Sequence, residues 1–330
     1  MNINEIAKLA GVSRATVSRY LNEGYVSGEK KERIRQVIEE TGYKPSSQAQ
    51  MLRTKKTKLV GVILPKISSD TVSRMVAGIS DILSEHGYQI LLANTNNDIS
   101  EEIKYLNIFK ESHVDGILFI ATIFTSRHKK ALKECRVPLV ILSQRLEGYS
   151  CVYHDNFHAA RELTELLLEN GRVPAYIGVT DKDEAVGLER RRGYEAALKR
   201  RKLPCRPELM AEGDFSIESG MEKMKELLER EPSVDSVFCA TDNIAVGAVL
   251  YLKEAGKSVP GDIQVAGIGD TIPARIVSPA LTTVHIPYKT SGMEAAKMLV
   301  ERMETEGAVV KELKMGYEIV MRGSLRGNGR

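Results

Sequence analysis

The sequence lacks the long apolar runs and paired cysteines that mark membrane and secreted proteins. No stretch of its 330 residues approaches the roughly 18 apolar residues that a membrane-spanning helix needs. The start MNINEIAKLAGVS carries Asn4, Glu5 and Lys8 where a signal peptide would be apolar. Four widely spaced cysteines without a C-x-x-C pair argue against a disulfide framework or a zinc site. We therefore expect a cytoplasmic protein with buried free thiols.

Short motifs of common catalytic sites are also missing. The chain contains no G-x-x-x-x-G-K-[ST], no H-E-x-x-H and no G-x-S-x-G. The stretch GIGD at 267–270 has too few glycines for a dinucleotide-binding loop. His154 and His158 flank Asp155, but their spacing across a strand–helix junction is a poor basis for a metal site. We predict no enzymatic activity, no cofactor and no bound metal.

Charge is distributed unevenly along the chain. Residues 1–58 contain 12 lysines and arginines against 6 acidic residues, whereas the whole chain carries a net charge of only +3. The remaining 272 residues therefore sum to −3. A small basic head on a slightly acidic body suggests a module that binds a polyanion. The same charge distribution would also be typical of a charged surface that faces only solvent.

The N-terminal residues have the pattern of three short helices. Asn2 or Asn4 can cap the first helix, and Ser13 can cap the second. Gly11 supplies the tight turn between them, and Gly42 ends the third helix. The helices are expected at residues 3–10, 14–22 and 27–41.

From residue 59 onward, short Val/Ile/Leu runs alternate with amphipathic helical segments. This alternation is typical of a parallel sheet covered on both faces. The strands are too numerous for one compact sheet, so we predict two Rossmann-like α/β lobes over 59–148 and 149–330, ending in a loose tail of ten residues. Strands are expected at 59–64, 89–93, 116–120, 138–142, 151–154, 175–179, 236–240, 263–268 and 281–285. Helices are expected at 70–86, 99–112, 126–134, 156–170, 187–201, 216–230, 242–255 and 288–305.

A polar and basic segment, YKPSSQAQMLRTKKTK at 43–58, separates the head from the body. Any helix in it would be too short to be stable alone in water. We interpret it as a linker that becomes ordered only when something binds it. The predicted domains are a head at 1–45, a hinge at 46–58 and a body at 59–330.

Motifs from both regions carry a specific resemblance. The head contains A-x-x-A-G-V-S, T-V-S-R, G-Y-x-P and A-x-x-L, and the body contains GVILP, RRRGYEAAL, EGDFSIESG, ATDNIAVGA and SPALTTV. Together they resemble the LacI/GalR family of bacterial transcription regulators over essentially the whole chain. The resemblance implies a helix-turn-helix head, a periplasmic-binding-protein-like body and a homodimer. The head motifs are Ala7, Ala10-Gly11-Val12-Ser13, Thr16-Val17-Ser18-Arg19, Gly42-Tyr43-Pro45 and Ala49-Leu52.

The resemblance places the second helix of the head in the major groove of DNA. An arginine there can form a bidentate pair with guanine, and an alanine can touch a thymine methyl group. Serine and threonine hydroxyls suit phosphates, and a hinge leucine suits a minor-groove wedge between base pairs. For Arg14 a phosphate contact remains the alternative. The implied base readers are Arg14, Ala15 and Arg19, the implied phosphate contacts are Thr16 and Ser18, and the implied hinge contacts are Ala49, Leu52 and Arg53.

The resemblance also implies a small ligand held between the two lobes. The usual family pattern G-[FY]-D-[DN] reads GIGD here, so Gly269 replaces an aspartate that often binds sugar hydroxyls. This departure resembles the trehalose-regulator branch, whose ligand is a sugar phosphate. For Arg190, within RRR at 190–192, a surface salt bridge is the alternative, and two of the three arginines are expected to form one. The implied effector residues are Lys66, Arg190, Phe215, Thr241, Asp242 and Asp270.

These observations predict a ligand-controlled regulator that binds palindromic double-stranded operator DNA. We expect a repressor of a carbohydrate-utilisation operon with a sugar or sugar phosphate as effector. Within the family, a phosphoprotein co-repressor or a purine remains an alternative effector. A solute-binding protein without DNA function is the alternative from another class, and it would require an export signal.

Overall fold

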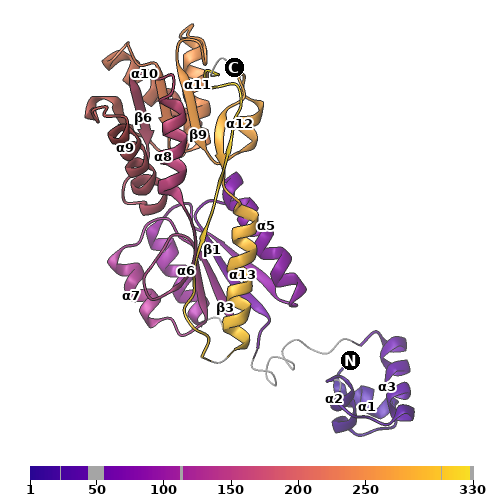
Figure 1. Cartoon of the computed structure of the whole chain (residues 1–330). Helices are drawn as coiled ribbons and strands as arrows, with labels where there is room; N and C mark the ends of the chain where they lie inside the picture. The colour runs from indigo at the N-terminus through magenta and orange to yellow at the C-terminus, as the bar shows by residue number, and fades with distance from the viewer. Residues whose placement is uncertain (23, 44–55, 112–113, 306, 328–330) are drawn as a thin grey trace. The chain divides into compact units, whose positions relative to one another are not determined.

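The structure is a computed structural model that describes residues 1–22, 24–43, 56–111, 114–305 and 307–327 (Figure 1). The chain divides into two compact units, Met1–Thr57 and Lys58–Arg330. None of the helices in the described ranges is long and apolar enough to cross a membrane. The predicted hinge contacts Ala49, Leu52 and Arg53 lie outside the described residues.

The three predicted helices of the head are present, and the first two begin at predicted caps. The Asn2 side chain accepts hydrogen bonds from two backbone N–H groups and forms a capping box with Glu5. The Ser13 hydroxyl accepts the N–H of Thr16 at 3.2 Å. Gly11 and Gly42 have φ angles of +61° and +62°, which favour glycine. The helices are α1 (Ile3–Leu9), α2 (Arg14–Tyr20) and α3 (Gly28–Thr41).

A small apolar core holds the head together. Ile6, Ala7 and Ala10 come from the first helix region, and Val17 and Ile34 come from α2 and α3. Ile6, Val17 and Ile34 are completely buried. Because Val17 anchors α2 to this core, the opposite face of α2 is left exposed.

The body contains two six-stranded sheets, each flanked by helices (Figure 1). The first sheet has the order β11-β5-β4-β3-β1-β2, and the second has the order β12-β10-β9-β8-β6-β7. All strand pairs are parallel except β10 with β12. The first lobe contains β1 (Leu59–Leu64), β2 (Gln89–Asn94), β3 (Gly116–Ile120), β4 (Leu139–Ser143), β5 (Ser150–His154) and β11 (Glu312–Met315), with α5 (Asp70–Glu85), α6 (Ile99–Glu111), α7 (Ser126–Glu134) and α13 (Tyr288–Glu304). The second lobe contains β6 (Pro174–Gly178), β7 (Met210–Glu212), β8 (Ser236–Cys239), β9 (Gln264–Ile268), β10 (Thr282–His285) and β12 (Glu318–Val320), with α8 (Asn156–Leu167), the π-helical turn η1 (Glu184–Leu188), α9 (Glu189–Arg200), α10 (Ile217–Arg230), α11 (Asp242–Glu254) and α12 (Ile272–Ile276).

The predicted division of the lobes at residue 148 is wrong. Strand β5 belongs to the first sheet, and the chain returns to the first lobe for α13 and β11 before β12 joins the second sheet. The chain therefore crosses between the lobes three times: after β5, between β10 and α13, and between β11 and β12. Apolar periodicity identifies a strand but not the sheet that it joins, which explains the error.

The prediction of a loose C-terminal tail is wrong for residues 321–327. Ser324 is completely buried, and its hydroxyl donates to the carbonyl of Val265 at 2.6 Å and accepts the N–H of Thr282 at 2.8 Å. The Arg326 guanidinium donates to several backbone carbonyls, including those of Asn170 at 2.9 Å and Asp262 at 2.8 Å. These hydrogen bonds hold the C-terminal segment against the second lobe.

The prediction of buried thiols is confirmed for two of the four cysteines. Cys151 and Cys239 are buried, and burial raises the pKa of both thiols. Cys135 is half-buried and Cys205 is exposed. The two buried cysteines lie in strands β5 and β8, whereas the other two lie outside the strands.

Replacing Arg326 with alanine should lower the free energy of unfolding of the body by about 1–3 kcal/mol, because several carbonyls lose a charged donor. Arg200→Ala is the matched control, since Arg200 is 63% exposed and pairs with Glu165 at the surface. That control should change the free energy by less than about 1 kcal/mol. Urea denaturation measures both, and equal effects would contradict a packed tail.

Candidate DNA-binding and effector sites

Helix α2 presents basic side chains that have no side-chain partner among the described residues of the head. Arg14, Ala15 and Arg19 are exposed. Neither Arg14 nor Arg19 forms an ion pair or a side-chain hydrogen bond with a described residue. Their guanidinium groups are thus available to phosphates or base edges. The two hydroxyl residues are half-buried and bonded locally, Thr16 to Ser13 at 2.9 Å and Ser18 to Asn22 at 3.4 Å.

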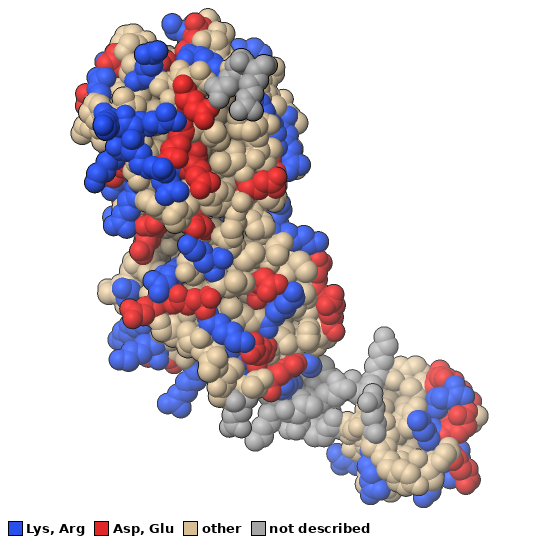
Figure 2. Space-filling view, viewed as in Figure 1, with Lys and Arg blue, Asp and Glu red and all other residues tan. Residues whose placement is uncertain are grey.

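The arginines of α3 are paired instead. Arg35 bonds Glu39 at 2.7 Å and also pairs with Glu32, and Arg33 lies 3.8 Å from Glu29. The hydrogen bond from Arg35 lowers the pKa of Glu32 below its usual value. Figure 2 shows red and blue side chains together on one side of the head, and blue ones without red neighbours on the side where Figure 1 shows α2. The uncompensated positive charge of the described head therefore includes α2.

A cavity of about 270 Å³ lies between the two lobes of the body. Its walls come from segments that follow the carboxyl ends of strands in both sheets, where ligands bind in open α/β folds. The first lobe contributes the segments after β1 to β4, the end of β5 and the start of α13, and the second contributes η1, α9 and the segment after β7. The polar and aromatic residues in its lining are Lys66, Ser69, Thr71, Asn97, Thr122, Ser143, Gln144, His154, Asn156, Asp183, Arg190, Asp214, Phe215, Ser216 and Tyr288.

Arg190 lies buried in the wall of this cavity, with only 3% of its surface exposed. Its Nε donates to Oδ1 of Asn156 at 2.8 Å, and its Nη1 donates to the carbonyl of Ala240 at 2.6 Å. Both acceptors are uncharged, and Arg190 forms no ion pair with any described carboxylate. The next two arginines form surface ion pairs, Arg191 with Asp181 at 2.7 Å and Arg192 with Glu189 at 2.8 Å, as predicted.

Two other predicted effector residues line the same cavity. Lys66 follows β1 and is exposed, and Phe215 is 41% exposed although it is a large apolar residue. Hydrogen bonds from Ser216 lower the pKa of the neighbouring Asp214, with a smaller contribution from the charge of Lys66. The cavity thus combines an exposed cation, a buried cation and an aromatic face.

The sequence did not predict a polar contact that joins the two lobes at this cavity. Gln144, after β4, donates from Nε2 to Oδ1 of Asp183 at 2.7 Å and accepts the N–H of Ala185 at 3.2 Å. Asp183 also accepts the N–H of Val186 at 3.0 Å, and burial raises its pKa. Gln144 lies two residues after the predicted strand at 138–142, a position that could have indicated it, and Asp183 gave no comparable signal.

Thr241 and Asp242 line a smaller adjoining cavity of about 120 Å³. The Thr241 side chain caps α11. The buried Asp242 carboxylate accepts hydrogen bonds from the N–H of Thr271 at 2.8 Å and from the Thr283 hydroxyl at 2.5 Å. Burial raises the pKa of Asp242 above its usual value. Because these protein groups already occupy both carboxylate oxygens, the geometry favours a positioning role for Asp242.

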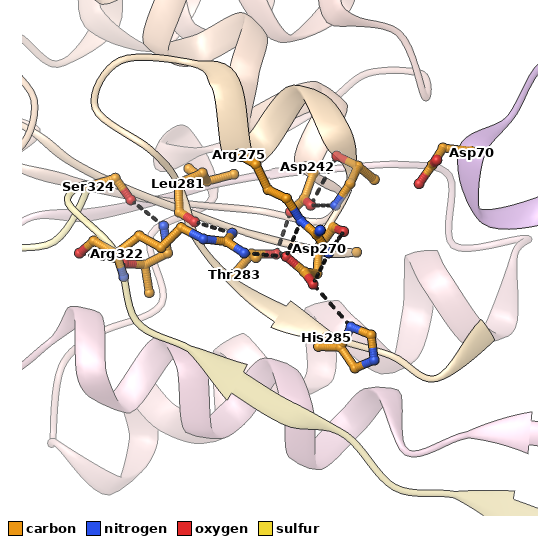
Figure 3. Close-up of polar contacts among 12 residues, drawn as sticks. Asp70, Asp242, Asp270, Arg275, Leu281, Thr283, His285, Arg322 and Ser324 are labelled. Atoms are coloured by element: carbon orange, nitrogen blue, oxygen red, sulfur yellow. Dashed lines mark hydrogen bonds and ion pairs between the residues drawn. The ribbon is translucent and has the colours of Figure 1, made fainter. Parts of the chain in front are cut away.

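The structure does not bring the side chain of Asp270 to either cavity. Figure 3 shows its carboxylate among Arg275, Arg322 and His285, with contacts of 2.7 Å to Arg275 and 3.1 Å to His285. Burial opposes its ionisation, but the hydrogen bonds from these three residues outweigh burial and lower the pKa to about 2. The cluster joins α12, β10 and the C-terminal segment, so we leave Asp270 out of the proposed effector site.

Comparison with known proteins identifies the family. Residues 2–46 match bacterial regulatory proteins of the lacI family, and residues 164–325 match the periplasmic binding protein-like domain. The sucrose operon repressor of Staphylococcus xylosus is 32% identical over 321 residues, covering 96% of this chain and 99% of that protein. This chain belongs to the lacI family. Catabolite control protein A of Priestia megaterium is 31% identical over 331 residues, covering 99% of each chain.

Solved structures agree with this assignment. The transcriptional regulator CelR in complex with cellobiose is 31% identical, with a TM-score of 0.76 over 98% of this chain and 99% of that one. The lac repressor dimer bound to operator, at 22% identity, has a TM-score of 0.89 over 98% of each chain, which shows the same fold. As a member of the lacI family, the protein is a ligand-responsive, DNA-binding transcriptional regulator and not an enzyme.

Replacing Arg14 or Arg19 with alanine should weaken binding to a DNA site selected by the wild-type protein by about 10- to 100-fold, because each can supply a bidentate base contact. Arg35→Ala is the control, since its guanidinium is engaged by Glu32 and Glu39. Fluorescence anisotropy at fixed salt measures the affinities. A uniform loss across all DNA sequences would contradict base reading and indicate a phosphate contact.

The pKa of Asp270 predicts a pH-dependent contribution to stability. A carboxyl with a pKa of about 2 in the folded state and about 3.9 when unfolded stabilises the fold above pH 4, and the contribution disappears as the pH falls toward 2. Asp270→Asn should therefore lower the free energy of unfolding by about 2 kcal/mol at pH 7 and by less at pH 3. Urea denaturation at both pH values tests this, and a difference that grows on acidification would contradict it.

Proposed function

We propose that this regulator represses a carbohydrate-utilisation operon from the cytoplasm and that its effector is a sugar or sugar phosphate bound between the lobes. Relatives named for sucrose and ribose operons support a carbohydrate, as does the relative solved with cellobiose. The family head and the arginines of α2, which pair with no described residue, support binding of palindromic operator DNA by a homodimer.

Arg190 is the observation that carries the effector proposal. A buried cation without an anionic partner is costly, and a ligand that supplies oxygen acceptors lowers that cost. Lys66 adds a second positive charge at the same cavity, which suits a phosphate group. The exposed ring of Phe215 offers an apolar surface to the ring of a sugar. Together these groups match a ligand with both hydroxyl or phosphate oxygens and a carbon face.

Contacts between the lobes provide a route from the effector to the DNA-binding state. Gln144 bonds Asp183 across the cavity, and Arg74 of α5 donates to the carbonyl of Gly269 in the second lobe at 2.9 Å. An effector that fits one arrangement of the lobes better than another shifts the population toward it. By linkage, the same shift changes the affinity for operator DNA.

Exposed apolar side chains support dimerisation through the body. Leu91 and Leu92 lie on β2, which is an edge strand, and Ile67 donates its N–H to the Asn94 side chain at the end of that strand. Ile272 and Ile276 of α12 are 62% and 76% exposed. Burial of such side chains against a second copy removes apolar surface from water, so we assign these residues of the two lobes to the homodimer interface.

A ligand panel tests the proposal. Thermal unfolding is measured with sucrose, trehalose, glucose 6-phosphate, trehalose 6-phosphate and hypoxanthine. We expect a sugar or sugar phosphate to raise the midpoint and to change the affinity for operator DNA. Arg190→Ala should weaken that ligand at least tenfold, whereas Arg192→Ala, which breaks only a surface ion pair, should leave it unchanged. A response to hypoxanthine alone, or to none of the five compounds, would contradict the proposal, and the second result would favour a protein effector.

A further inference from the structure

His154 carries a buried polar atom without a partner. The residue ends β5 and is 7% exposed, and its Nε2 is buried without a hydrogen-bond partner among the described residues. It also lines the effector cavity between the lobes. A buried nitrogen left unbonded costs free energy, so a group that enters the cavity and bonds it gains binding energy.

The surroundings of His154 keep its imidazole neutral. Burial and the positive charge of Arg190 lower its pKa to about 3. A neutral imidazole nitrogen is either a donor or an acceptor, depending on the tautomer. A sugar hydroxyl can satisfy it in both cases because a hydroxyl donates and accepts. The site therefore suits a hydroxyl group at this position better than an additional cation.

His154 lies in one of the segments that cross between the lobes and contacts a second. The residue itself lies at the first crossing, and its ring meets the ring of Tyr288, at the second crossing, edge to face with centroids 5.3 Å apart. The backbone carbonyl of His154 accepts a hydrogen bond from Asn156 at 3.4 Å, and Asn156 accepts one from Arg190.

Tyr288 extends this set of contacts to α5 of the first lobe. The Arg74 guanidinium lies 5.2 Å from the centroid of the Tyr288 ring and donates to the carbonyl of Gly269 in the second lobe. A group bound at His154 would thus lie next to Tyr288, whose neighbour Arg74 bonds the second lobe.

We propose that Nε2 of His154 forms a hydrogen bond with a hydroxyl group of the effector and couples its binding to the arrangement of the lobes. This inference rests on the proposed function, because it requires a carbohydrate in the cavity. It assigns to His154 an effector contact at the crossing between the lobes. This contact is separate from the one that we propose for Arg190, which lies in the second lobe.

The test compares two substitutions of His154 with a control. His154→Leu removes the polar atom, and His154→Gln keeps a donor and an acceptor at the end of a side chain of similar length. Tyr176→Phe is the control, because the Tyr176 hydroxyl is also buried without a described partner but lies on β6 in the core of the second lobe. Each protein is titrated calorimetrically with sucrose, trehalose, glucose 6-phosphate and trehalose 6-phosphate.

We expect His154→Leu to weaken the sugar bound by the wild type about tenfold or more and to reduce its effect on DNA affinity. His154→Gln should recover part of the sugar affinity and part of the effect on DNA affinity. Tyr176→Phe should have wild-type values of both quantities. Wild-type affinity and an unchanged DNA response in His154→Leu would overturn the proposal.

Nitrogen NMR of the histidines in the full-length wild type tests the same contact without a substitution. Addition of the bound sugar should shift the Nε2 resonance of His154, and an unchanged resonance at saturation would overturn the proposal even if His154→Leu fails to fold. If none of the four sugars binds the wild type, the proposed function itself fails, and the contact fails with it. Binding to the wild type with no change at His154 refutes only the contact.

Discussion

The close packing of α13 on α5 is the constraint on which the body depends. A Cβ on Gly78 would lie 2.0 Å from the carbonyl oxygen of Lys289, and one on Gly292 would lie 2.1 Å from that of Met75, so the two helices meet backbone to backbone. Helix α13 follows β10 of the second lobe, and its packing on α5 holds this part of the chain in the first lobe. It thereby places Tyr288 at the edge of the cavity, where it meets His154 and Arg74.

The two units use positive charge in different ways. In the head, the arginines of α3 are neutralised by glutamates, whereas those of α2 remain available to a polyanion. In the body, Arg191 and Arg192 pair at the surface, and Arg190 keeps a buried charge next to a cavity. Arg14, Arg19 and Arg190, which form no ion pair with a described carboxylate, are the arginines that we propose to contact external ligands.

Local patterns predicted most of the secondary structure, because buried strands and capped helices have strong signals. The runs at 59–64 and 116–120 and the helix at 126–134 were predicted to the residue. The short elements β7, β11, β12 and α12 were missed, since three to five residues contain too little periodicity. Among the residues that line the larger cavity, Arg190, Lys66 and Phe215 were predicted from the sequence, whereas His154, Gln144 and Asp183 were not, because only the fold brings them to it.

The sequence by itself determined the helix-turn-helix head, the alternation of strands and helices and the family of the chain, because caps, apolar runs and motifs are local properties. Only the tertiary structure decided which sheet β5 and β11 join, that residues 321–327 pack against the second lobe, and that Asp270 is bonded to Arg275 and Arg322. The physical reason is that sheet membership, burial and side-chain partners depend on residues far apart in the chain, which no local pattern encodes.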